Sequence, residues 1–255
     1  MTRQSALVRR PGRRLAEGIV THIERTPVDV RLAQQQWDGY VAALRQAGWQ
    51  ILEVPPADEC PDGVFIEDTM VVFRDLAVIA RSGAEQRRPE TTAAERVVAG
   101  AGYRVERISE PATLDGGDVL KVGDTVYVGV GGRTNACGVT QLRRHLEPLG
   151  AKVVDVPVTK VLHLKSAVTA LPDGTVIGYP PLVDDVDAFG SFVEVSEPTG
   201  SHVVLLGGDT VLMAASAPET AGLLASRGLE VVVVDISEFE RLEGCVTCLS
   251  VRLRG

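Results

Sequence analysis

Two cysteines near the end of the chain raise the first chemical question. Cys245 and Cys248 stand in a C-x-x-C spacing within EGCVTCLSVRL, residues 243–253. A structural zinc site would need a second C-x-x-C or a pair of histidines, which this sequence lacks. A thioredoxin-like redox pair begins a helix, whereas Cys248 is predicted to begin the last strand. The pattern favours one nucleophile with an unrelated thiol beside it, and a C-x-x-C redox protein is the alternative.

A histidine is the expected partner of a nucleophilic thiol. His163, in VLHLKSAVTAL, is predicted to enter a strand just before a hairpin. His145 falls on a polar helix face, and His22 and His202 fall near element ends without an evident partner. A histidine can protonate a leaving amine and then activate water. His163 is therefore the candidate acid and base, although a lone histidine is more often structural.

Carboxylates gather before two predicted strands. Asp62, Glu67 and Asp68 lie in CPDGVFIEDTMVVF, and Asp115 and Asp118 lie in ATLDGGDVLKVG. Buried carboxylates are costly unless they are paired, and around a thiol they suit a flat cation such as guanidinium. Adjacent strand residues point to opposite faces, so one of Glu67 and Asp68 would contact substrate and the other would brace it. Turn chemistry is a sufficient account of Asp118.

Two arginines complete the set of candidate binding residues. Arg87 and Arg133 are predicted in glycine-flanked loops, RSGAEQRRPE and GVGGRTNACG. Arginine in such a loop suits bidentate binding of an amino-acid carboxylate, and a solvated surface arginine is an equal alternative. The second loop lacks the G-x-G-x-x-G and Walker patterns of nucleotide sites.

The composition excludes several classes of protein. The chain has 255 residues, 45% of them hydrophobic, and a net charge of 26 − 34 = −8. The absence of a basic run and the scarcity of aromatic residues argue against a nucleic-acid partner. No apolar run reaches the roughly 18 residues that cross a bilayer, and the first residues lack a signal-peptide core. With sparse cysteines, these features predict a cytoplasmic protein. They leave its oligomeric state open between monomer and homodimer.

A repeated pattern must position these residues. Helices are predicted at 29–47, 92–101, 134–149 and 216–227, each followed by a glycine and a strand. Hairpins are predicted with turns at 74–75, 123–124, 172–174 and 207–209, and a shortened helix is expected around 184–192. Strands at 248–253 and 6–9 would complete a fifth sheet. We predict a single domain, residues 1–255, with an α/β fold: a pseudo-five-fold α/β propeller of ββαβ units around a central channel. An ordinary mixed α/β sheet is the alternative.

The chain also resembles a known family. FIEDTMVVF, RSGAEQRR, LDGGDVL, GRTN, LHLKS and EGCVTCLSVRL run in the order found in the dimethylarginine dimethylaminohydrolases, members of the guanidino-group-modifying (pentein) superfamily. The resemblance covers nearly the whole chain and implies a role for each of ten residues. These are Cys248 as nucleophile; His163 as general acid and base; Asp68 and Asp115 holding guanidinium; Asp62 and Glu67 completing the acidic shell; Arg87 and Arg133 binding the α-carboxylate; the Leu242 backbone meeting the α-amino group; and Val20 in a lid of roughly residues 10–22.

The reaction implied by the resemblance needs no metal or organic cofactor. Dimethylarginine or monomethylarginine would be hydrolysed to citrulline and an amine through a covalent S-alkylthiouronium on Cys248. A sister enzyme acting on Nω-hydroxyarginine or arginine is the nearest alternative. A non-catalytic methylarginine-binding module is a further one.

Overall fold

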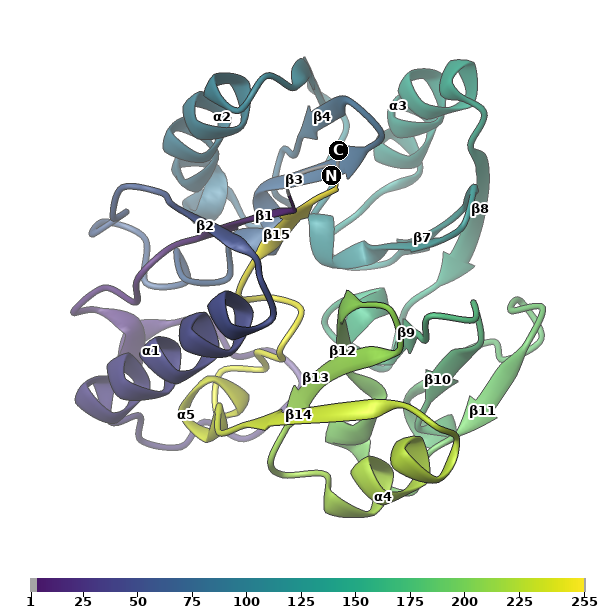
Figure 1. Ribbon diagram of the computed structural model, residues 1–255. Coiled ribbons are helices and arrows are strands. Elements are labelled where there is room, and N and C mark those ends of the chain that lie inside the picture. The colour runs from purple at the N-terminus through teal and green to yellow at the C-terminus, as the bar shows by residue number, and fades with distance from the viewer. Residues whose placement is uncertain (1–3, 255) are drawn as a thin grey trace.

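Five small sheets surround a common centre in the computed structural model, which describes residues 4–254 (Figure 1). Each sheet has three strands: an antiparallel pair, which is a hairpin in four of the sheets, and a third strand that runs parallel to one strand of that pair. The chain termini meet in one sheet, because β15 near the C-terminus pairs with β1 near the N-terminus. The predicted five-fold α/β propeller is therefore confirmed, and the mixed single sheet is excluded.

The sheets follow one another along the chain. The first contains β15 (Val251–Leu253), β1 (Ser5–Val8) and β2 (Gln50–Glu53). The second contains β3 (Met70–Phe73), β4 (Leu76–Ile79) and β5 (Arg104–Arg107), and the third β6 (Val119–Val122), β7 (Thr125–Val130) and β8 (Lys152–Pro157). The fourth contains β9 (Val168–Ala170), β10 (Val176–Gly178) and β11 (Phe192–Glu194). The fifth contains β12 (Val203–Gly207), β13 (Thr210–Ala214) and β14 (Glu230–Val234).

The predicted helices lie on the outside of this ring. They are α1 (Val30–Gln46), α2 (Thr91–Gly100), α3 (Ala136–Leu146) and α4 (Pro218–Ser226). A further short helix, α5 (Ser237–Glu240), lies near the C-terminus and was not predicted. The Asp29 side chain caps α1 by accepting from the N–H groups of Arg31 and Leu32. Gly48 follows α1 with φ +84°, the left-handed conformation that glycine adopts most easily.

One predicted helix does not form. Residues 184–192 hold turns, preceded by the 3-10 helix η7 (Pro180–Leu182), so the shortened helix expected there is wrong. Aromatic side chains occupy part of the space, with the Phe189 ring centroid 5.1 Å from Tyr127 and 6.2 Å from Phe192.

Five hydrophobic clusters form the core, and each joins two neighbouring sheets. The cluster containing Leu142 joins the second and third sheets to α3, and the one containing Val98 joins the first and second sheets to α2. The clusters around Val168, Leu224 and Trp37 continue the series and return to the first sheet. The ring is therefore closed by packing as well as by strand pairing, and burial of these apolar side chains is its main source of stability.

Tight turns at the centre replace the expected beginnings of the first strands. Glu67 and Asp68 lie in the 3-10 helix η2 (Ile66–Thr69), not in a strand, and Cys248 lies in a turn before β15. Equivalent 3-10 helices, η4 (Gly116–Asp118), η6 (Leu164–Ser166) and η8 (Pro198–Ser201), precede three other hairpins. These turns bond across units, as when the Glu67 N–H donates to the Cys248 carbonyl at 3.1 Å. Five strands cannot all continue into one centre, so the chain turns there.

The structure also bears on the membrane question. Among residues 4–254, no helix has the length and apolarity needed to span a bilayer.

Close contact between two central turns gives a test of the fold. A Cβ atom on Gly116 would lie 2.1 Å from the Glu67 carbonyl oxygen and 2.7 Å from that of Met70. Gly116→Ala should therefore destabilise the protein by about 1–3 kcal/mol through overpacking. Gly39→Ala is the matched control, because the exposed Gly39 in α1 has open space around it. That change should stabilise by about 0.5–1 kcal/mol. Equal unfolding midpoints in urea for the two variants would contradict the close packing of the turns.

Candidate active site

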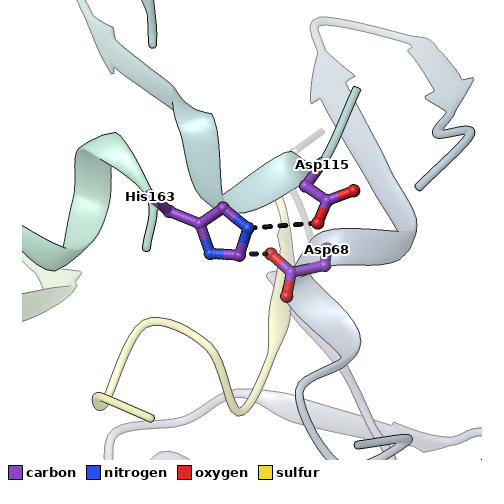
Figure 2. A group of neighbouring side chains, drawn as sticks. All are labelled: Asp68, Asp115 and His163. Carbon is purple, nitrogen blue, oxygen red and sulfur yellow. Dashed lines mark hydrogen bonds and ion pairs between the residues drawn. The ribbon is translucent and has the colours of Figure 1, made fainter. Parts of the chain in front are cut away.

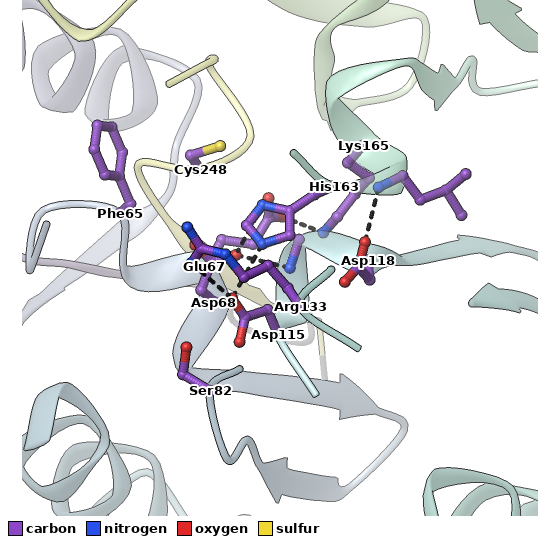
Figure 3. A network of polar contacts seen from close by, with 12 residues as sticks. Phe65, Glu67, Asp68, Ser82, Asp115, Asp118, Arg133, His163, Lys165 and Cys248 are labelled. Carbon is purple, nitrogen blue, oxygen red and sulfur yellow. Dashed lines mark hydrogen bonds and ion pairs between the residues drawn. The ribbon is translucent and has the colours of Figure 1, made fainter. Parts of the chain in front are cut away.

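The predicted site residues converge on one narrow cavity. Its lining includes seven of the ten: Cys248, His163, Asp62, Asp68, Arg87, Arg133 and Leu242. Asp115 contacts His163 from beside the cavity, whereas Glu67 and Val20 do not line it. The side chains come from different units of the ring, delivered by the central turns (Figure 3).

His163 lies between two carboxylates (Figure 2). Its Nε2 is 3.1 Å from Asp115 Oδ2, and its Nδ1 is 3.8 Å from Asp68 Oδ1. Burial disfavours the imidazolium, but Asp68, Asp118 and Asp115 outweigh that cost and raise the pKa of His163 to about 9. His163 therefore carries a proton at neutral pH, as a general acid must.

Glycine makes this close approach possible. A Cβ atom on Gly117 would lie 2.6 Å from Asp68 Oδ1 and 2.7 Å from His163 Nδ1. Instead the Gly117 N–H donates to Asp68 Oδ1 at 2.9 Å. The two glycines of LDGGDVL thus admit the packing of neighbouring turns and side chains.

Asp68 is held ionised by an arginine as well as by His163. Arg87 Nη1 donates to Asp68 Oδ2 at 2.6 Å, and each of the two side chains is only 5% exposed. Burial opposes the charged carboxylate, but His163 and Arg87 outweigh it and lower the pKa of Asp68 to about 2. Asp68 is thus anionic throughout the physiological range.

Arg87 is not in the glycine-flanked loop that the sequence suggested. Its buried side chain comes from the 3-10 helix η3 (Glu85–Glu90) and also donates to both Glu90 carboxylate oxygens, at 3.0 and 2.8 Å. Its Nη2 bonds the carbonyls of Asp62 and Phe65 as well. Glu90 was not among the predicted residues, and its i, i+3 spacing from Arg87 is the signal that could have identified it.

Arg133 differs from Arg87 in having an unused donor. Its buried Nη1 has no hydrogen-bond partner among residues 4–254, and the nearest carboxylate oxygen, Asp115 Oδ2, is 3.7 Å away. A buried unsatisfied guanidinium N–H is unusual in a native protein and points to a ligand. Arg133 is therefore the better placed of the two arginines to bind an incoming anion.

Asp115 and Asp118 are fixed by hydrogen bonds from neighbouring units. Asp115 Oδ1 accepts from the Gly83 N–H at 3.1 Å. Asp118 accepts from Thr134 Oγ1 at 2.6 Å and from the Leu164 N–H at 3.0 Å. Burial raises the pKa of Asp118 to about 6. Asp118 is therefore more than a turn residue, because it anchors the turn that carries His163.

Cys245 lies much closer to Cys248 than a bystander in a loop would. The two buried sulfur atoms are 3.3 Å apart, and Cys245 Sγ also lies 3.2 Å from Thr247 Oγ1. That separation exceeds the roughly 2.05 Å of a disulfide, so both are free thiols. Their shared hydrogen bond lowers the pKa of Cys245 to about 5 and raises that of Cys248. The hydrogen bond thus favours the anionic form of Cys245 and the protonated form of Cys248.

Glu67 points away from the cavity that Asp68 lines. Its Oε1 pairs with Lys165 Nζ at 2.6 Å and with Arg252 Nη2 at 2.5 Å. The prediction that one acid of Glu67 and Asp68 braces the structure agrees with this arrangement. The carboxylate of Glu67 does not belong to the acidic surface of the cavity, and Lys165 and Arg252 were both missed by the sequence reasoning.

The N-terminal segment closes one side of the cavity. Asp62 accepts from the Ile19 N–H at 3.1 Å, and Glu243 accepts from the N–H groups of Thr21 and His22. Ile19, rather than Val20, lines the cavity, and the half-buried Val20 packs against the core cluster that includes Cys248. Burial raises the pKa of Asp62. The carboxylate of Asp62 therefore fastens the segment in this structure.

The triad of Asp68, Asp115 and His163 also has the spacing of a metal-binding set. One donor atom from each lies within 4.8 Å of the others. Asp68 already bonds Arg87 and Gly117, and Asp115 bonds Gly83 and His163. Both carboxylates are thus already held in place by cations and backbone N–H groups. Their charge and spacing suit an organic cation as well as a metal ion.

Comparisons with known proteins agree with this arrangement. A family model described as arginine deiminase matches residues 50–203. The chain is 66% identical to an N(G),N(G)-dimethylarginine dimethylaminohydrolase of Streptomyces coelicolor, over 100% of this chain and 98% of the relative. It is 34% identical to the enzyme of that name from Pseudomonas aeruginosa, over 96% of this chain and 98% of the relative.

Solved structures of that enzyme have the same fold. A cysteine-to-serine variant from Pseudomonas aeruginosa in complex with citrulline superposes with a TM-score of 0.92 at 33% identity, covering 99% of this chain and 100% of that one. A histidine-to-glycine variant carrying an adduct with S-methyl-L-thiocitrulline gives the same TM-score and coverage at 32% identity. The chain therefore belongs to the dimethylarginine dimethylaminohydrolase family, within the pentein superfamily.

Proposed function

We propose that this protein hydrolyses Nω,Nω-dimethyl-L-arginine, and Nω-monomethyl-L-arginine, to L-citrulline and dimethylamine or methylamine. The observation that carries the proposal is the single cavity in which Cys248 meets a protonated His163 held between two carboxylates. The names of the relatives and the ligands in their solved structures support the same reaction.

Substrate binding follows from the charges around the cavity. Asp68 and Asp115 would hold the guanidinium, because both are buried and already oriented by backbone N–H groups. Arg133, with its unused Nη1, would bind the α-carboxylate. The Leu242 backbone would meet the α-amino group, since Leu242 lines the same cavity. Arg87 would act mainly by positioning Asp68, and Val20 would belong to the segment covering the site.

The reaction would proceed in two steps. Cys248 attacks the central guanidinium carbon while His163 gives its proton to the departing amine, leaving an S-alkylthiouronium on the sulfur. His163, now neutral, then removes a proton from water, which attacks the same carbon and releases citrulline and the thiol. The carboxylates keep the substrate cationic and its central carbon electrophilic.

Substrate binding gives Cys248 a way to become a thiolate. At rest, the hydrogen bond with Cys245 raises the pKa of Cys248, and burial and the nearby Glu67 and Asp68 raise it further. A guanidinium bound beside Cys248 would favour the thiolate there by Coulomb attraction.

The compartment and domain organisation are further proposals. We place the protein in the cytoplasm, because its four cysteines are free thiols, the usual state in a reducing compartment. We propose that residues 1–255 act as one domain, because the five core clusters join the units in a closed ring.

A substrate panel tests the proposed function. Purified protein should release citrulline from dimethyl- and monomethylarginine with kcat/KM at least about tenfold higher than from arginine or Nω-hydroxyarginine, since about 1.4 kcal/mol of differential binding suffices. Arginine is the main competing substrate, because the matching family model is described as arginine deiminase. Preference for arginine would assign a deiminase activity instead, and binding without citrulline would identify a non-catalytic module.

Single substitutions at the two cysteines separate their roles. Cys248→Ser should abolish citrulline formation, because a serine hydroxyl at this site lacks the acidity of the thiol. Cys245→Ser should retain most of the activity at saturating substrate, because the hydroxyl that it introduces can still hydrogen-bond to the thiol of Cys248. Equal loss in both variants would contradict the single-nucleophile assignment and favour a redox pair.

The pH profile tests the state of His163. With its pKa raised from 6.5 to about 9, His163 keeps its proton through neutral pH, so kcat/KM should fall only as the pH rises through about 9. Asp115→Asn removes a negative charge beside the ring and should move this alkaline limb to lower pH. Asp124→Asn, at the exposed β6–β7 turn, should leave it in place. An alkaline limb near 6.5 in the unaltered protein would contradict the charge network.

A further inference from the structure

A second cavity lies behind the turns that form the active site. It has a volume of about 100 Å³ and shares no lining residue with the cavity of Cys248 and His163. Neighbours of the active-site residues line it instead: Glu67 beside Asp68, and Thr247 beside Cys248. Each of these two turns therefore presents one residue to the active site and the residue before it to this rear cavity.

The rear cavity is strongly cationic. Its lining includes Lys121, Lys165, Arg252 and Arg254, with Glu67 as the one acidic residue. Four cationic groups thus face one anionic group, although the chain as a whole has a net charge of −8. The net charge around the rear cavity is therefore opposite in sign to that of the whole chain.

Glu67 neutralises only part of it. Lys165 and Arg252 both bind the same oxygen, Oε1, at 2.6 and 2.5 Å. Lys165 is only 8% exposed, so this cation is enclosed by protein and not spread over the surface. One carboxylate shared by two cations leaves a net positive charge at the wall of the cavity.

The other two cations interact with carbonyl groups. Lys121 Nζ donates to the Val72 carbonyl at 2.6 Å, and Arg254 Nη2 donates to that of Leu205 at 2.8 Å. Neither forms an ion pair with a carboxylate within residues 4–254. Carbonyl dipoles hold such groups in place but do not neutralise their charge.

The cations consequently destabilise one another. Desolvation, followed by repulsion from Lys165, Arg252 and Arg254, lowers the pKa of Lys121 from its ordinary value, although part of its side chain is exposed. Desolvation and Arg252 also lower the pKa of Arg254, which stays charged at neutral pH. An anion among these groups would offset the repulsion between them.

We propose that the rear cavity is a binding site for one small multivalent oxyanion of the inorganic sulfate or phosphate type. Guanidinium and ammonium groups from separate elements could each donate to a different oxygen, which is the geometry such anions require. A cavity of this size holds several water molecules, which suits a compact tetrahedral ion. The site is independent of the hydrolase activity proposed above.

Calorimetric titration with sodium sulfate tests the proposal directly. Sulfate does not titrate near neutral pH, and sodium chloride can keep the ionic strength constant. The full chain should bind one sulfate ion saturably at pH 7.

Two variants and a matched control locate the binding. Lys121→Gln should weaken sulfate binding at least about tenfold, as loss of one charge-assisted hydrogen bond predicts. Arg254→Gln serves as a second variant in case Lys121→Gln fails to fold. Lys152→Gln removes an exposed charge in β8, outside the cavity, and should leave the affinity unchanged. The absence of saturable binding, or equal affinities in Lys121→Gln, Arg254→Gln and Lys152→Gln, would overturn the proposal.

Discussion

The pairing of Asp68 with Arg87 on one side and His163 on the other is the interaction on which the site depends. All three side chains are buried, and removing one partner of such a pair typically costs about 3–5 kcal/mol because it leaves an uncompensated charge. Arg87 keeps Asp68 ionised, and Asp68 with Asp115 keeps His163 protonated. The acid needed for amine departure and the anions needed for guanidinium binding thus maintain each other before any substrate arrives.

The central turns explain how a ring of short strands can hold so many buried charges. Adjacent residues in a turn face opposite sides, so Asp68 joins the active site while Glu67 binds Lys165 and Arg252 behind it. The adjacent Cys248 and Thr247 divide in the same way, and His163 and Lys165, two residues apart in one turn, also line different cavities. The active-site cavity and the rear cavity therefore share turns but no lining residue. The hydrophobic clusters close the ring around both sets of charges.

Much of the fold could be predicted because its signals are local. The helix patterns, the glycines that end the helices, and the hairpin turns each depend on a few neighbouring residues, and all but the helix near 184–192 were confirmed. The candidate site residues were found from their types and from resemblance. Their roles depend on contacts between distant segments, such as Arg133 beside Asp115, or on tight turns, such as the one that brings Cys245 against Cys248. Periodicity does not encode those contacts. The periodicity placed Glu67, Asp68 and Cys248 at the beginnings of strands. These residues form turns instead, because the centre of the ring is too crowded for the strands to continue.

The central claim is that Cys248 forms the covalent bond to the substrate carbon while His163 supplies the proton. Acid quenching of the protein during turnover of dimethylarginine, followed by peptide mass spectrometry, tests it most directly. The account predicts that the peptide containing Cys248 gains the mass of the substrate less dimethylamine. Fragmentation should place the added mass on Cys248 and not on Cys245. An adduct on Cys245, or a disulfide between the two cysteines in place of an adduct during turnover, would contradict the account.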